Sequence, residues 1–83
     1  MKVNPELFDI VEDLTATGLL LEATGILGMS FSSTKLAEMV LNNKKDDREE
    51  LNNAIKILIE QNLLLLKKDI YYVNSDYVQI DNF

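Results

Sequence analysis

The 83-residue sequence contains neither cysteine nor histidine. Without cysteine the chain forms no disulfide bond, so its stability must come from packing. A zinc site of the usual thiolate and imidazole kind has no ligands here, and the acids suggest no other metal site. The sequence also has no glycine-rich phosphate loop. We therefore expect no cofactor, no metal and no enzymatic activity.

Long apolar runs are missing as well. No stretch approaches the eighteen or so residues that a membrane span needs, so we expect no contact with a membrane. The opening segment carries acids among its apolar residues, at Glu6, Asp9, Glu12 and Asp13. Because signal peptides and transit peptides lack such acids, we expect neither, and the expected location is the cytoplasm.

Positive charge is scarce, with eight bases against fourteen acids and a net charge of −6. An acidic total repels nucleic acid and favours solubility. The composition is 47% hydrophobic, which is ordinary for a folded protein. A chain of this length buries only about 60% of its unfolded surface, so residues 1–83 are expected to form one domain.

The first half of the chain predicts a helix, a strand and a second helix. Asn4, Pro5 and Glu6 are typical of a helix start, with Asn4 as the N-cap. Helical spacing continues to residue 27, and the stretch 15–18 is where a kink or break is expected, which leaves open one helix or two. Residues 29–32 alternate like a short strand, and Ser32, Ser33 and Thr34 are candidate N-caps for the helix that follows.

The second half predicts a third helix followed by a β-hairpin. Asp46 with Glu49, or Asp47 with Glu50, has the spacing of a capping box. The helix is expected to end near residues 61–62. Residues 63–66, four consecutive leucines, are expected to be buried core, followed by a turn at 67–69 and a second strand over 70–73. Inward-facing candidates in the hairpin are Leu64, Leu66, and Ile70 or Tyr72. Residues 75–83 form a C-terminal extension of undetermined conformation.

Two segments carry a resemblance to a known superfamily. "NAIKILIEQNLLLLKKDIYYVN" (53–74) resembles the third helix and first wing strands of winged-helix proteins, and "MSFSSTKLAEMV" (29–40) resembles their first strand and second helix. The resemblance covers roughly residues 5–74 and implies a mainly α fold with a small β-sheet (α+β). The implied order is helix, short strand, helix, helix and a two-stranded hairpin, the wing.

Two functions are compatible with this pattern. The acidic start of the third helix favours binding to another protein with a basic surface, as an inhibitor, adaptor or regulatory subunit. The residues expected to make this contact are Asp46, Asp47, Glu49, Glu50, Lys67, Lys68 and Asp69.

The alternative is a DNA-binding transcriptional regulator that acts as a dimer, because winged helices that bind DNA place the third helix in the major groove. The residues that would contact DNA are Lys44, Lys45, Arg48, Asn52, Lys67 and Lys68. Residues 19–27 have more apolar side chains than one helix face needs, so they are a candidate homodimer contact as well as candidate core.

Overall fold

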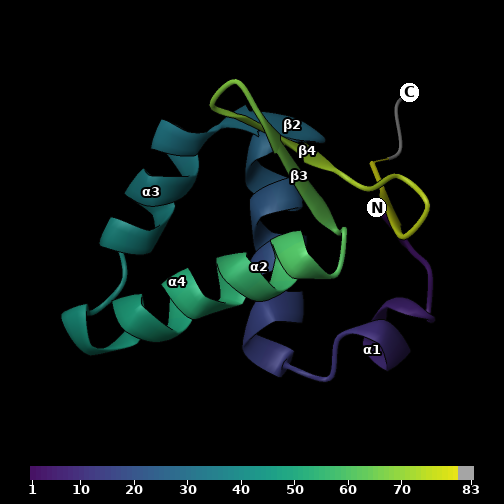
Figure 1. The fold of residues 1–83 in the computed structure, drawn as a ribbon, viewed down its shortest axis with the longest axis horizontal. Coiled ribbons are helices and arrows are strands. Elements are labelled where there is room, and N and C mark those ends of the chain that lie inside the picture. The colour runs from purple at the N-terminus through teal and green to yellow at the C-terminus, as the bar shows by residue number, and fades with distance from the viewer. Residues whose placement is uncertain (81–83) are drawn as a thin grey trace.

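A computed structural model describes residues 1–80 as a mixed α+β fold with four helices and two small antiparallel sheets (Figure 1). The coarse prediction of an α+β fold is therefore confirmed. The elements in chain order are β1 (Lys2–Val3), α1 (Leu7–Ile10), α2 (Leu14–Leu27), β2 (Ser30–Ser32), α3 (Ser33–Leu41), α4 (Lys45–Glu60), β3 (Leu64–Lys67), β4 (Ile70–Val73) and β5 (Val78–Gln79).

The helical pattern of residues 5–27 forms two helices, and the break lies at residues 11–13 rather than at 15–18. Asp13 causes the second start, because its Oδ1 accepts a hydrogen bond from the backbone N of Ala16 at 3.0 Å. Such N-caps are worth about 1 kcal/mol. Asn4 is not the N-cap of α1. Its Oδ1 accepts from the N of Glu6 at 3.0 Å, which makes a turn just before the helix.

The core lies where α2 packs against α4. Leu20 on α2 and Leu58 on α4 are almost completely buried, and Phe31 and Leu36 cover the cluster from β2 and α3. α3 begins as predicted, because the Oγ of Ser32 accepts from the N of Lys35 at 3.2 Å. Burial of a leucine side chain contributes about 1.5–3 kcal/mol, so this cluster is the main source of stability.

The larger sheet has the strand order β2-β4-β3, with both pairings antiparallel. Lys68 and Asp69 connect β3 to β4 and have φ values of 50° and 63°. A two-residue loop with both φ values positive is the preferred hairpin connection, and it fixes the register. Lys67 consequently lies opposite Ile70, and Leu65 opposite Tyr72.

This register corrects two predictions about the hairpin. Tyr71 and Val73 are the buried residues of β4, whereas Tyr72 is 44% exposed and Ile70 is only partly buried. The four consecutive leucines are not all core. Leu63 and Leu64 are buried, but Leu65 and Leu66 are 62% and 45% exposed. Leu65 lies opposite the exposed Tyr72, on the other face of the sheet from Leu64, because successive side chains of a strand point to opposite faces.

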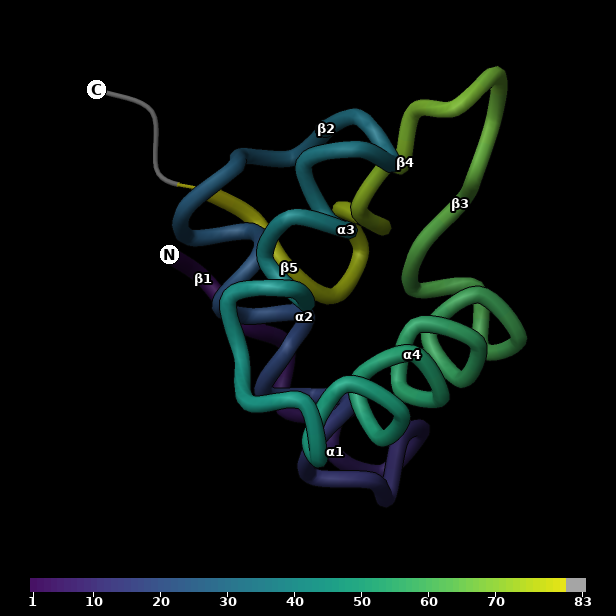
Figure 2. The backbone as a smooth tube through the Cα atoms, turned by 90° about the vertical axis from the view of Figure 1, so that its left-hand side faces the viewer, coloured from purple at the N-terminus to yellow at the C-terminus, as the bar shows by residue number. Residues whose placement is uncertain are grey.

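The two ends of the described chain lie side by side, as Figure 2 shows. β1 pairs with β5 in an antiparallel ladder, with Lys2 opposite Gln79 and Val3 opposite Val78. Val78 is fully buried, so residues 75–80 of the predicted extension pack onto the domain. Residues 81–83 lie outside the described part of the chain.

Candidate functional site

The start of α4 carries four exposed acids, Asp46, Asp47, Glu49 and Glu50. The predicted capping box is wrong. The N-cap is Lys44, its side chain makes no capping bond, and the N of Asp47 donates to the O of Lys44 at 2.9 Å. Asp46 and Asp47 therefore lie inside the first turn, where their negative charge complements the positive end of the helix dipole.

Glu50 joins the start of α4 to the start of α2. The Oγ1 of Thr15 donates to the Oε1 of Glu50 at 2.7 Å. This contact brings a second pair of exposed acids, Glu12 and Asp13, which immediately precede α2, to the same end of the molecule. We call these residues the acidic surface: Glu12, Asp13, Asp46, Asp47, Glu49 and Glu50.

Arg48 lies among the acids of α4 but points back toward α3. Its Nη2 donates to the O of Leu41, the last residue of α3, at 3.1 Å. The guanidinium thus offsets the negative end of the α3 dipole. Its Nε is buried, with no hydrogen-bond partner among the described residues. Arg48 consequently acts as a structural link between two helices.

The hairpin tip lies far from the acidic surface. Lys67, Lys68 and Asp69 are all exposed at the tip, which is at the top of Figure 1, while α4 starts at the lower left. The acids at the start of α4 and the residues of the hairpin tip therefore lie apart. Asn52, further along α4, lies toward the tip, because it lines the same groove as Ser33, whose N donates to the O of Asp69 at 2.8 Å.

A groove of about 370 Å³ runs between α3, α4 and the inner side of β4. Its polar lining comes from Ser33, Asn52 and Lys56, and its apolar lining includes Ile55 and Tyr71. Asn52 is the one member of the predicted DNA-contacting set that lines this groove. Lys56 is a basic neighbour that the prediction left out, although both lie on the same face of α4, four residues apart.

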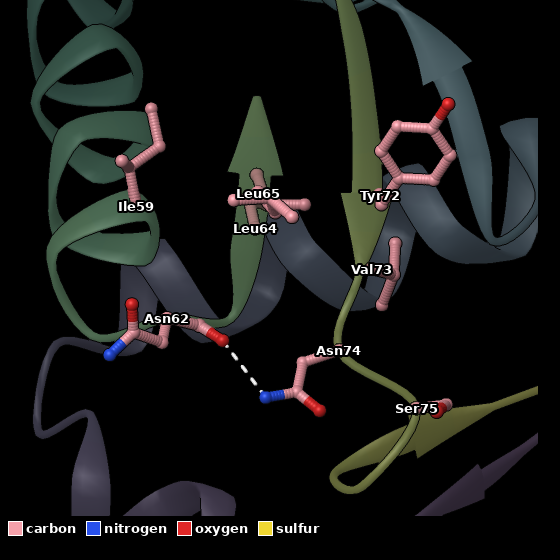
Figure 3. A pocket seen from close by; sticks show the side chains of 8 residues that line it. All are labelled: Ile59, Asn62, Leu64, Leu65, Tyr72, Val73, Asn74 and Ser75. Carbon is pink, nitrogen blue, oxygen red and sulfur yellow. Dashed lines mark hydrogen bonds between the residues drawn. The ribbon is translucent and has the colours of Figure 1, made fainter. Parts of the chain in front are cut away.

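A second hollow, of about 480 Å³, lies at the base of the hairpin (Figure 3). Asn74 closes one end, because its Nδ2 donates to the O of Asn62 at 2.9 Å. Leu65 and Tyr72 lie opposite each other on neighbouring strands and line the hollow together with Ile59. This exposed apolar pair contradicts the prediction that all four leucines are core. The alternation along a strand, counted from a two-residue turn, would have found it.

The predicted homodimer segment, residues 19–27, is mostly core. Leu19, Leu20 and Ala23 are buried, and the Oγ1 of Thr24 donates to the O of Leu20 at 2.7 Å within the helix. Ile26 is the large apolar side chain of this segment that is exposed. Packing against α4 therefore accounts for most of the excess of apolar residues.

Two kinds of site are not found in residues 1–80. No three acidic side chains of this range come together in a group that could hold a metal ion. None of its helices is long and apolar enough to cross a membrane.

Comparisons of the sequence with protein-family models and curated proteins, and of the structure with solved structures, gave no match.

Proposed function

We propose that the protein is a non-enzymatic winged-helix protein that acts by binding another protein through the acidic surface. The scaffold assignment is supported by the element order α2, β2, α3, α4, β3, β4 and by the central place of β4 in the sheet. In this proposal α1, β1 and β5 are additions that pack onto the winged helix.

The hydrogen bond between Thr15 and Glu50 is the observation that carries the proposed surface. It holds the starts of α2 and α4 together, so that acids from two separate elements face the same partner. Arg48 is the base in the middle of the acidic segment 46–50, and its side chain points toward Leu41 and so away from this surface. The partner is therefore a protein with a basic patch, and charge complementarity would accelerate its association.

An apolar side chain lies beside the acids. Leu14, the first residue of α2, is 81% exposed and directly precedes Thr15. Protein interfaces commonly have buried apolar anchors within a polar rim. We propose that Leu14 is such an anchor, which gives the surface a contact that salt does not weaken.

Capture from an extract of the native cells tests this function. The immobilised protein should retain a stoichiometric protein partner, and the variant D46N/D47N/E49Q should retain much less of it. The matched control is E22Q/E38Q/D76N, which makes the same charge change at exposed acids elsewhere. Recovery of nucleic acid without a protein partner, or equal loss in both variants, would refute the proposal.

Once the partner is known, its kinetics provide a second test. Charges at the rim of an interface act mainly on the association rate and on its salt dependence. D46N/D47N/E49Q should therefore slow association and flatten the salt dependence. Replacing Leu14 with alanine should instead speed dissociation, because an anchor acts after the encounter.

DNA binding is the second candidate. It is favoured by the groove between α3 and α4, where Ser33, Asn52 and Lys56 offer hydrogen-bond donors. A mobility-shift titration at about 50 mM salt, where phosphate contacts are strong, should detect it. The variant D46N/D47N/E49Q separates the two functions by sign, because removal of negative charge would tighten DNA binding and weaken binding of a basic protein.

A further inference from the structure

The outer edge of β3 has unpaired backbone groups. The N of Val73 donates to the O of Met29 at 2.8 Å, on the β2 side of β4. The N of Asn74 donates to the O of Leu63 at 3.0 Å, on the β3 side. Because successive residues of a strand point their hydrogen-bonding groups to opposite sides, Leu63, Leu65 and Lys67 bond to β4. Leu64 and Leu66 therefore direct theirs away from the sheet, and no strand within residues 1–80 pairs with them.

The side chains along this edge are apolar and accessible. Leu65 and Leu66 are the middle residues of β3, and both are substantially exposed, as is Tyr72 next to Leu65. Natural proteins usually protect an edge strand with charges, a proline or a covering element. In β3 the charge is confined to its last residue, Lys67, so the centre of the edge is left open for pairing.

We propose that a second copy of this chain pairs with this edge, β3 against β3 in antiparallel orientation, about a two-fold axis perpendicular to the sheet. Such an axis leaves each sheet face on its own side, so only residues of the same face can lie opposite each other. In one register the outward-pointing backbone groups of both Leu64 and Leu66 are paired, and this register places Leu64 opposite Leu66 of the second copy. Each of these pairs exchanges two hydrogen bonds, and Leu65 lies against its own copy at the axis.

Charge complementarity favours the second copy over an unrelated strand. In this register Lys67 lies opposite Leu63 of the second copy, and Lys68 lies opposite its Asn62. Asn62 and Leu63 of the second copy directly follow the C-terminus of its α4. The last turn of α4 contains Glu60 and no basic residue, so the negative end of the helix dipole is not neutralised there. The two lysines therefore approach a negative helix end, and the symmetry provides this contact twice.

The β3 edge is separate from the acidic surface. The acidic surface lies at the start of α4, while the β3 edge follows its end. Pairing through β3 would leave both acidic surfaces free, so the dimer would present two of them to a partner. The segment 19–27 is not used, since most of its apolar side chains are already in the core.

Sedimentation across a concentration series tests the dimer. The wild-type chain should shift from monomer to dimer as its concentration rises, and L65K should weaken association at least tenfold, because two like charges would meet at the axis. L41K is the control, since Leu41 is also exposed and the charge change is the same. A wild-type chain that stays monomeric up to about 1 mM, or equal weakening by L41K, would overturn the proposal.

Single cysteines test the register, because the chain has none of its own. Leu65 forms a non-hydrogen-bonded pair with its copy, and such pairs have Cα atoms about 4.5 Å apart, within the range that a disulfide spans. L65C should therefore cross-link rapidly under mild oxidation, with its circular dichroism unchanged. L41C and I26C should cross-link only slowly. Efficient cross-linking of I26C instead, or equal rates at all three positions, would show that the β3 edge is not the interface.

Discussion

The guanidinium of Arg48 donates to the backbone oxygen of Leu41 at 3.1 Å, so the fourth residue of α4 binds the last carbonyl of α3. The loop between these helices, residues 42–44, is short, and this bond holds its two sides together. A residue that sequence alone would assign to ligand binding is thereby assigned to the fold.

Replacing Arg48 with methionine should lower the free energy of unfolding by about 1 kcal/mol, because the charged donor at the end of α3 is lost. The Nε of Arg48 is a buried donor without a partner among the described residues, and its removal should raise the free energy of unfolding. This gain offsets part of the loss and keeps the net change small. Chemical denaturation measures the change. Replacing Lys45 with methionine, which removes the same charge from an exposed position, should change stability by less than about 0.5 kcal/mol.

Replacing Thr15 with valine removes the donor to Glu50 and should cost about 0.5–1.5 kcal/mol. A double-mutant cycle with Glu50→Ala isolates the interaction, and we expect the two changes to couple because the side chains are in contact. Thr34→Val in the first turn of α3 is the control, and it should not couple with Glu50→Ala. Additive losses for Thr15 and Glu50 would contradict the proposed link between α2 and α4.

Adjacent leucines of the run 63–66 should respond very differently to truncation. Leu63→Ala should cost about 2–5 kcal/mol, because Leu63 is fully buried and truncation leaves a cavity. Leu65→Ala should cost less than about 0.5 kcal/mol in the monomer, as expected for an exposed side chain. Thermal unfolding at low protein concentration compares the two variants. Similar losses at both positions would mean that the whole run is core.

The hairpin turn can be improved. Lys68 and Asp69 both have positive φ. Glycine adopts positive φ without strain and asparagine and aspartate adopt it more readily than most residues, whereas lysine adopts it with some strain. The double variant K68N/D69G introduces the pair that this turn type prefers and should stabilise the chain by about 0.5–1 kcal/mol. Lys68→Pro, which cannot adopt positive φ, should destabilise it. Denaturation midpoints of the three proteins give the order.

Local chemistry made part of this fold predictable from the sequence. The cap at Ser32, the strand around Phe31 and the end of α4 near Gln61 each depend on a few neighbouring residues, and the structure has them where they are expected. The break between α1 and α2 depends on Asp13 as a cap, and an aspartate among other acids does not reveal that role in the sequence. Predicting the register of the hairpin requires the number of residues in its turn, and a turn without glycine does not show this number in the sequence.

The candidate site was harder to predict than the fold, for a reason that Glu50 illustrates. Its bond partner, Thr15, is 35 residues away in the chain. A segment analysis can find the acids of α4, but it cannot find that Glu12 and Asp13 lie beside them. Arg48 shows the converse, because a base counted as available for DNA is engaged by a carbonyl of the preceding helix.

The pairing of β1 with β5 has a mechanical consequence. Lys2 lies opposite Gln79, so the chain enters and leaves this two-residue ladder at the same end. A force that pulls the two ends of the described chain apart would therefore open the ladder bond by bond, like a zipper, instead of shearing all its bonds at once. The first event under tension should be the separation of β1 from β5 at low force. This separation uncovers Val78 while α2 and α4 remain packed against each other.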